Sequence, residues 1–191
     1  YGPMVATGKV IMSFGLTEPG AGSDSGAIAS RAVRKGDKYI INGTKSFVTN
    51  GPVADIITLF AMTDASKGVK GISAFVVPTD APGVTVARWD RKMGIRGSPT
   101  AQLVFEDVEI PSDNLIGQEG NGFVYAMKAL DRSRPVIGAQ ACGLAKGALE
   151  QAVKYAKDRR QFGKPIGQFQ GIGWMLADMA AEVDAARSLV Y

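Results

Sequence analysis

Histidine is absent from this chain of 191 residues, and cysteine occurs only once. Without histidine, the chain holds no Ser-His or Cys-His nucleophile of its own and no histidine-ligated metal site. The single cysteine, Cys142, excludes a disulfide within the chain. Its neighbours are small residues, which indicates packing in a helix rather than a reactive thiol. We therefore predict no metal site and no catalytic cysteine.

Long apolar runs are also absent, so we expect no membrane span. Hydrophobic residues make up 46% of the chain and charged residues 21%, and 22 basic against 18 acidic side chains give a net charge of +4. Basic residues gather in two clusters: Arg88, Arg91, Lys92 and Arg96, and Lys154, Lys157, Arg159, Arg160 and Lys164. These clusters suit phosphate-bearing molecules. They lack the interleaved aromatic residues of a nucleic-acid surface, so we expect no nucleic-acid partner.

Both ends of the sequence suggest a longer protein. The first residues, Tyr1-Gly2-Pro3, contain no initiator methionine and no signal-peptide pattern. Toward the other end, apolar residues recur every three or four positions, as on one face of a helix; they are Phe169, Ile172, Leu176, Met179, Val183, Ala186 and Val190. No glycine, proline or capping residue closes this pattern. We expect the chain to be the middle of a larger protein.

The first part of the chain has the pattern of a β-domain. From residue 10 to about 115, six or seven short strands alternate with turns such as Gly36-Asp37, and no helical pattern intervenes. Such a pattern is typical of an antiparallel β-sandwich or barrel. We predict that this β-domain covers residues 1–116.

From about residue 120 the pattern is helical. We predict one helix from Asn121 to Asp131, a break or kink at Pro135, a second helix to about Arg160, and a third from Gln168. Residues 117–191 would then form the first helices of an up-down α-helical bundle. The fold class predicted for the whole chain is multi-domain α+β.

A glycine-rich octapeptide, Thr17-Glu18-Pro19-Gly20-Ala21-Gly22-Ser23-Asp24, follows an apolar run that we predict to be a strand. Its two glycines allow positive φ and close approach of another molecule, and Thr17 and Ser23 supply hydroxyls for a phosphate or a ring heteroatom. The third glycine of a dinucleotide fingerprint and its βαβ context are both missing. The octapeptide is thus either a surface turn or a ligand-binding loop of a β-domain.

A second segment, Lys45–Gly51, carries an aromatic residue and a hydroxyl on one face of a predicted strand. Phe47 and Thr49 share that face, and Val48 points to the other. An aromatic plane beside a hydroxyl suits a flat heteroaromatic ring. An ordinary cross-strand aromatic pair is the alternative.

Five segments of the chain resemble the acyl-CoA dehydrogenase family of flavoenzymes, in the order in which that family has them. They are Phe14–Asp24, Asn42–Gly51, Gly94–Ser98, Val104–Pro111 and Asp158–Gly163. The resemblance implies a subunit with an N-terminal helical domain, a middle β-domain and a C-terminal four-helix bundle. This chain would hold the middle domain and the first part of the bundle. The implied cofactor is FAD, and the implied substrate is an acyl-CoA thioester.

The same resemblance implies cofactor-binding residues in the predicted β-domain. The flavin ring would lie against Phe14, Gly15, Leu16 and Thr17, with Gly22 and Ser23 near the pyrophosphate. Phe47, Val48 and Thr49 match the segment that covers the ring, where Phe47 stands for the usual tryptophan and Thr49 is the hydroxyl beside flavin N5. Ser23 would also lie near the thioester.

In the predicted helical region the resemblance implies two further groups of residues. Arg159, Phe162 and Gln170 match residues that reach the FAD of a neighbouring subunit, which implies a homo-oligomer, either a dimer or a tetramer. Asp131 and Arg134 match positions that contact the acyl-CoA. An arginine suits phosphate or adenine in either role.

The activity implied is α,β-dehydrogenation of an acyl-CoA to a trans-2-enoyl-CoA. A carboxylate takes the α-proton while the β-hydrogen passes as hydride to flavin N5. Most family members place that glutamate late in the bundle, which would lie beyond Tyr191, and a minority place it at the position of Ser133. Because serine cannot serve as this base, we predict no catalytic residue in the chain and expect the chain alone to be inactive. Serine at this position also favours a straight short or medium acyl chain.

Other interpretations stay open. An acyl-CoA oxidase would share the flavin site but pass electrons to oxygen. A non-catalytic flavin- or nucleic-acid-associated relative, or a binding module without flavin, are further alternatives. The family implies an electron-transfer flavoprotein as acceptor. With no targeting segment in the chain, we expect a cytoplasmic protein in a bacterium and a mitochondrial matrix protein in a eukaryote.

Overall fold

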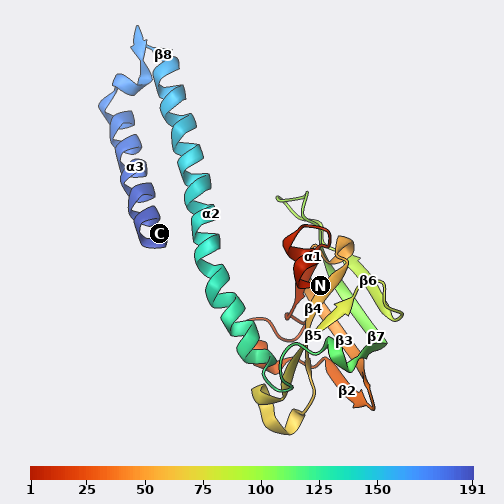
Figure 1. Ribbon diagram of the computed structural model, residues 1–191. Coiled ribbons are helices and arrows are strands. Elements are labelled where there is room, and N and C mark those ends of the chain that lie inside the picture. The colour runs from red at the N-terminus through yellow and green to blue at the C-terminus, as the bar shows by residue number, and fades with distance from the viewer. The chain divides into compact units, whose positions relative to one another are not determined.

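The computed structural model describes all residues, Tyr1–Tyr191, and they form two compact units (Figure 1). The first unit is Tyr1–Met127 and the second is Lys128–Tyr191. A short helix, α1 (Gly2–Ala6), precedes a seven-stranded curled sheet in the first unit, and helices form the second. The predicted α+β fold is confirmed.

The sheet consists of strands that are mostly paired with their neighbours in antiparallel fashion. They are β1 (Met12–Gly15), β2 (Arg31–Lys35), β3 (Lys38–Thr49), β4 (Ile56–Met62), β5 (Ile72–Pro78), β6 (Val84–Trp89) and β7 (Thr100–Pro111). Their spatial order is β1-β4-β2-β3-β7-β6, and β5 pairs with β4. The predicted hairpin at Gly36-Asp37 joins β2 to β3.

Two pairings of this sheet are parallel, which the sequence pattern did not predict. Strand β4 runs parallel to β1 along its length and to β2 at the single pair Arg31 and Met62. A parallel pair needs a long crossover connection. Here the β2–β3 hairpin lies within that connection, so the sequence between β1 and β4 looks like an ordinary antiparallel meander.

The core of the first unit is formed by inward-facing residues of β3, β4, β5 and β7. Tyr39, Ile41, Phe75 and Phe105 are all buried, and the rings of Tyr39 and Phe75 meet edge to face with their centroids 4.8 Å apart. Alternation of buried and exposed residues along β3 follows from the two-residue period of a strand.

Helix α2 (Gly122–Asp158) is continuous, so the predicted break at Pro135 is wrong. A proline inside a helix costs about 3 kcal/mol, because it removes one hydrogen bond and crowds the preceding turn. Ending one helix and starting another would leave up to four N–H and four C=O groups without helical partners at the new termini. The single lost bond at Pro135 is the smaller cost.

The second unit contains the rest of α2, a two-stranded hairpin of β8 (Arg160–Gln161) and β9 (Lys164–Pro165), and α3 (Gln170–Val190). Most of the predicted apolar face of α3, including Ile172, Met179 and Val183, is half-buried. On α2, by contrast, Ile137 and Leu144 are exposed. None of the helices combines the length and the apolarity needed to cross a membrane.

Candidate functional site

The glycine-rich octapeptide forms a tight turn at the end of the segment that begins with β1. Glu18 and Ala21 exchange two backbone hydrogen bonds, with N···O distances of 2.9 and 3.2 Å, so that Pro19 and Gly20 form the corner. Ala21 is buried, whereas Gly22 is exposed. Neither Gly20 nor Gly22 has a positive φ, and a Cβ atom at either would meet nothing within 4 Å. The fold itself therefore does not require glycine at these two positions.

The segment from β1 to the octapeptide lies beside the end of β3. The Ser13 hydroxyl donates to the Thr49 carbonyl oxygen at 2.9 Å, and the Ser46 N–H donates to the Thr17 carbonyl oxygen at 2.8 Å. The structure thus brings together two groups of predicted cofactor residues that are about 30 positions apart in the sequence, 14–17 and 47–49. Phe14 itself packs against Phe60 with ring centroids 5.0 Å apart.

A β-bulge in β3 determines how Phe47 is presented. Lys45 pairs with Leu103 and Val48 with Ala101, so β3 has one more residue than β7 across this interval. Phe47 takes a left-handed conformation there, with φ of 56°, and its side chain is 66% exposed. Such a conformation is strained for an aromatic residue and is typical of functional positions. Thr49 is exposed on the same strand, and the Val48 side chain is in the core.

A buried ion pair lies directly behind this junction, and we did not predict it from the sequence. Lys45 Nζ is 2.7 Å from Glu18 Oε1 and donates to the Leu16 carbonyl oxygen at 3.1 Å, and the Lys45 side chain is 0% exposed. Glu18 also accepts hydrogen bonds from the N–H groups of Ala29 and Ser30, at 2.6 and 3.0 Å. The sequence could have indicated that Lys45 is buried. Alternate residues of a strand face the same side, and Lys45 lies an even number of residues after the buried Tyr39 and Ile41.

Burial and pairing act in opposite directions on the pKa of Glu18. Removal from water by itself raises that pKa, but the hydrogen bond and charge of Lys45 and the Ala29 N–H outweigh it and lower the pKa below its usual value. Burial lowers the pKa of Lys45, and Glu18 offsets only part of this effect. The carboxylate is therefore held ionised by the lysine that it neutralises.

The donors of this region fit a flavin dinucleotide. The hydroxyls of Thr17, Ser23 and Thr49 have no hydrogen-bond partner within the protein, unlike the Ser13 hydroxyl beside them. The backbone N–H groups of Gly22 and Ser23 likewise donate to no backbone acceptor. Free amides next to glycine suit a pyrophosphate, and free hydroxyls beside an exposed aromatic ring suit a heteroaromatic edge.

The remaining predicted site residues belong to the second unit. Asp131 and Arg134 form an exposed ion pair, with Nη1 2.8 Å from Oδ1. Arg159 precedes the β8–β9 hairpin, and Gln170 begins α3. These positions remain predictions as ligand contacts.

Phe162 lies at the turn of the β8–β9 hairpin. Phe162 and Gly163 both have positive φ, 52° and 77°, as in a type I′ turn. The Phe162 side chain is 92% exposed and meets the ring of Phe169 edge to face at 6.0 Å. As with Phe47, an aromatic residue occupies a strained position and points into solvent.

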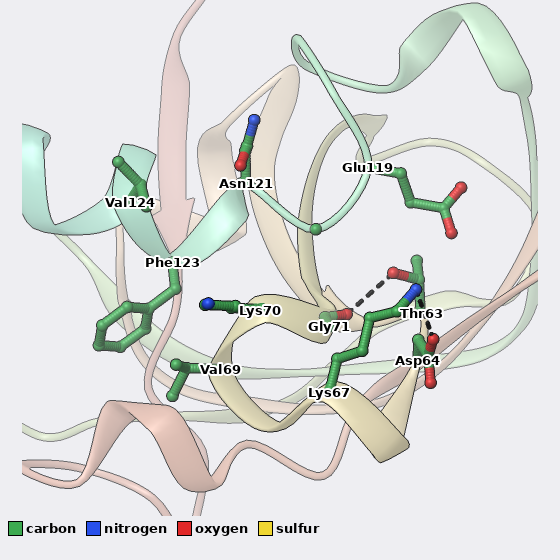
Figure 2. Close-up of a pocket in the computed structure, with 11 residues that line it drawn as sticks. Thr63, Asp64, Lys67, Val69, Lys70, Gly71, Glu119, Asn121, Phe123 and Val124 are labelled. Atoms are coloured by element: carbon green, nitrogen blue, oxygen red, sulfur yellow. Dashed lines mark hydrogen bonds and ion pairs between the residues drawn. The ribbon is translucent and has the colours of Figure 1, made fainter.

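A pocket of about 450 Å³ in the first unit was also not predicted, and none of the predicted cofactor residues lines it. Figure 2 shows its lining, which comes from the segments 63–71 and 119–124. Lys67 pairs with Asp64 at 2.8 Å, and this pairing, together with hydrogen bonds from Ser66, lowers the pKa of Asp64 to about 2. Lys70 also lines the pocket and forms no ion pair, and Phe123 adds an aromatic ring. The Glu119 carboxylate lines the same pocket and accepts a hydrogen bond from the Tyr39 hydroxyl at 2.8 Å, so Lys70 is the cation of this lining that is left for an anionic group.

Comparison with families of known proteins matches nearly the whole chain. A family model described as "Acyl-CoA dehydrogenase, middle domain" matches residues 13–108, and one described as "Acyl-CoA dehydrogenase, C-terminal domain" matches residues 120–191. The two matches together leave only short segments of the chain uncovered.

Individual relatives agree with these matches. Cyclohex-1-ene-1-carbonyl-CoA dehydrogenase of Syntrophus aciditrophicus is 54% identical over 95% of this chain and 44% of its own length. Caffeyl-CoA reductase-Etf complex subunit CarC of Acetobacterium woodii is 48% identical over 98% of the chain and 49% of its own length. The structure of butyryl-CoA dehydrogenase from Megasphaera elsdenii superposes with a TM-score of 0.96 at 48% identity, covering 98% of this chain and 49% of that one. The chain spans about half the length of the relatives it matches.

Proposed function

The chain belongs to the acyl-CoA dehydrogenase family, and on this premise we propose that it is the flavin-binding part of an enzyme that dehydrogenates acyl-CoA thioesters to trans-2-enoyl-CoA products. One observation carries the proposal. Residues 14–17 and 47–49 lie side by side, with the Thr17 and Thr49 hydroxyls unpartnered and Phe47 turned out of the sheet by a bulge.

Each group of residues in the first unit has a proposed task. Phe14, Gly15, Leu16 and Thr17 form the backbone surface against which the ring rests, and Phe47 covers it. Thr49 orients the ring through its hydroxyl, and Val48 contributes backbone only, because its side chain is in the core. Gly22 and Ser23 hold the pyrophosphate through their free N–H groups.

FAD, when bound, would supply the acceptor for the hydride that leaves the β-carbon. The chain's own part is to bind and orient. Ser23 would lie near both cofactor and thioester, and hydrogen bonds to the thioester carbonyl would make the α-proton more acidic. We propose that the base is a carboxylate outside this chain, since Ser133 occupies the one alternative position.

The second unit would contribute through an assembly. We propose that Arg159, Phe162 and Gln170 reach the cofactor of another copy in a homodimer or homotetramer, and that Asp131 and Arg134 contact the acyl-CoA. Exposure of Phe162 in a strained turn supports this role. We also propose a domain boundary between residues 116 and 117.

The pocket between segments 63–71 and 119–124 is proposed to hold the nucleotide end of the CoA thioester. Lys70 would meet a phosphate and Phe123 the purine ring. The volume of about 450 Å³ is in the range of small-molecule sites.

We propose a short or medium straight acyl chain as substrate and an electron-transfer flavoprotein as acceptor. The butyryl-CoA dehydrogenase relative supports the first, and the relative named as a subunit of an Etf complex supports the second. The relative that acts on a cyclohexene-carbonyl thioester makes a cyclic acyl group the competing substrate. An oxidase that uses oxygen is the competing reaction. A cytoplasmic or mitochondrial matrix location stays a prediction.

The test uses the protein expressed from its whole gene. It should bind FAD, and anaerobic addition of butyryl-CoA should bleach the flavin absorbance more completely than cyclohex-1-ene-1-carbonyl-CoA does. Re-oxidation by an electron-transfer flavoprotein but slowly by air supports a dehydrogenase, and rapid re-oxidation with hydrogen peroxide release identifies an oxidase. A folded protein that cannot be reconstituted with FAD would contradict the proposal.

A further inference from the structure

The buried pair of Glu18 and Lys45 is the ionic contact of this chain that is most removed from water. The side chains are 6% and 0% exposed, whereas those of the pair formed by Lys38 of β3 and Glu109 of β7 are 52% and 58% exposed. A buried pair adds little to stability compared with well-packed apolar residues, because both charges must leave water. Its presence at this place therefore points to a role in specifying one arrangement.

The pair joins three segments of the first unit through its side chains. Glu18 belongs to the octapeptide, and its carboxylate accepts the N–H groups of Ala29 and Ser30 before β2. Lys45 comes from β3 and donates to both Glu18 and the Leu16 carbonyl oxygen. Every bond made by these two side chains thus involves the octapeptide or the residue just before it, Leu16.

These bonds lie where β3 departs from its pairing with β7. The bulge follows Lys45 directly, and the next residue, Ser46, donates its N–H to the Thr17 carbonyl oxygen. Two consecutive residues of β3 therefore bind two consecutive carbonyl groups, that of Leu16 and that of Thr17, where the octapeptide begins. The following residue is Phe47, in its left-handed conformation.

We propose that Glu18 and Lys45 are positioning residues of the flavin site: without touching the cofactor, they fix residues 14–17 against the bulge that presents Phe47 and Thr49. This proposal rests on the proposed function, which supplies FAD as the ligand of the site. It explains why a lysine occupies a core position of β3, where an apolar residue would pack without desolvating a charge. It also makes the pair insensitive to salt, since buried charges are poorly screened.

The experiment compares four variants in the protein expressed from its whole gene. Lys45→Met and Glu18→Gln each leave one buried partner alone, and the double variant Glu18→Gln/Lys45→Met removes both charges together. The matched control is Lys38→Met/Glu109→Gln, which removes the exposed pair between β3 and β7. The measurements are FAD affinity by reconstitution, visible circular dichroism of bound flavin, unfolding midpoint, and hydrogen exchange of the Ser46 N–H.

We expect each single variant to weaken FAD binding by about 10- to 100-fold, the loss typical of residues that orient metal ligands without touching the metal. The double variant should have a higher unfolding midpoint than either single variant. It should still show weakened FAD binding, an altered flavin dichroism and faster hydrogen exchange at the Ser46 N–H. The control should match the wild type in all four measurements. If the single variants do not fold, the double variant carries the test.

A double variant with wild-type FAD affinity, dichroism and Ser46 exchange would overturn the proposal, because the pair would then be a replaceable core contact. Hydrogen exchange distinguishes failure of the positioning role from failure of the proposed function, because it can be measured without FAD. If the wild type binds no FAD, faster exchange at Ser46 in the double variant still supports the positioning role, and unchanged exchange overturns it.

Discussion

The two units of this chain carry their site residues in opposite ways. In the first unit, the segments 14–17 and 47–49 rest on a continuous buried core and on the pair of Glu18 and Lys45. In the second, Ala156 is the one buried residue, and the predicted contacts Arg159, Phe162 and Gln170 are all exposed. The difference teaches that a buried core fixes the positions of the predicted site residues in the first unit. The second unit leaves its predicted contact residues exposed to solvent.

Truncation of an apolar side chain should lower the free energy of unfolding far more in the first unit than in the second, and this is the largest difference that we expect. Phe75→Ala removes a fully buried ring that packs on Tyr39, and we expect it to lower the free energy of unfolding by about 3–5 kcal/mol. Leu144→Ala, at a position 72% exposed, should change it by less than about 0.5 kcal/mol. Urea denaturation of both variants checks this. Equal losses of unfolding free energy would show that Leu144 belongs to a buried core of the second unit.

The next effect is a dependence of stability on pH that the first unit alone should show. Glu18→Gln leaves Lys45 charged and unpaired in the core, which should cost about 3 kcal/mol at pH 7. Because the folded-state pKa of Glu18 lies below its usual value of 4.5, its contribution is complete above that pH and is lost as the pH falls through the lowered pKa. Wild type and variant should therefore converge in acid, as measured by denaturation from pH 7 to pH 2.5.

Asp64 provides the control for that acid range. Its pKa of about 2 comes from exposed partners, chiefly Lys67. Asp64→Asn should leave the convergence between wild type and Glu18→Gln in place. A constant difference between them at all pH values would contradict the assignment to Glu18.

The third prediction tests whether the strained backbone conformation of Phe162 in the second unit serves ligand binding and not the fold. Phe162→Asn places in the turn a residue that tolerates positive φ, and we expect a gain of about 0.5 kcal/mol after loss of the contact with Phe169. Phe162→Leu, which keeps the strain, should give no gain. Thermal unfolding measures both. A less stable Asn variant would mean that Phe162 serves the fold of the hairpin.

A further prediction compares two hydroxyls within the first unit. Ser13→Ala removes a hydroxyl bonded to the Thr49 carbonyl and should cost about 1 kcal/mol of unfolding free energy. Thr49→Val removes an unpartnered hydroxyl, so stability should change by less than about 0.5 kcal/mol while FAD affinity falls about 2- to 10-fold. Reconstitution titrations and denaturation curves distinguish the two. Equal losses of stability would give Thr49 a structural role instead.

Local patterns in the sequence predicted the elements well. Alternation placed Phe47 and Thr49 on one side of β3 and Val48 on the other, and the turn at Gly36-Asp37 predicted the β2–β3 hairpin. The three-and-four spacing predicted α3 to within two residues of its start. These features depend on neighbours in the chain, which the sequence displays directly.

Features that depend on distant residues were not predictable in the same way. The parallel pairing of β1 with β4, the partner of Lys45 and the pocket with Lys70 each join segments that the sequence separates by tens of residues. Whether α2 continues through Pro135 depends on two costs: the one hydrogen bond lost at proline and the unpaired backbone groups at two new helix ends. The rule that proline ends a helix does not compare them.

The pairing of β1 with β4 has a consequence for how the protein folds. The Ile11 N–H is bonded to the Asp55 carboxylate, 44 positions later, so we expect this edge of the sheet to form after the local β2–β3 hairpin. Contacts of such long sequence separation form late, because the chain entropy of closing the loop must be lost first. We therefore expect the octapeptide to reach its final position late in folding. A ligand that binds there would act mainly by slowing unfolding and would have little effect on the folding rate.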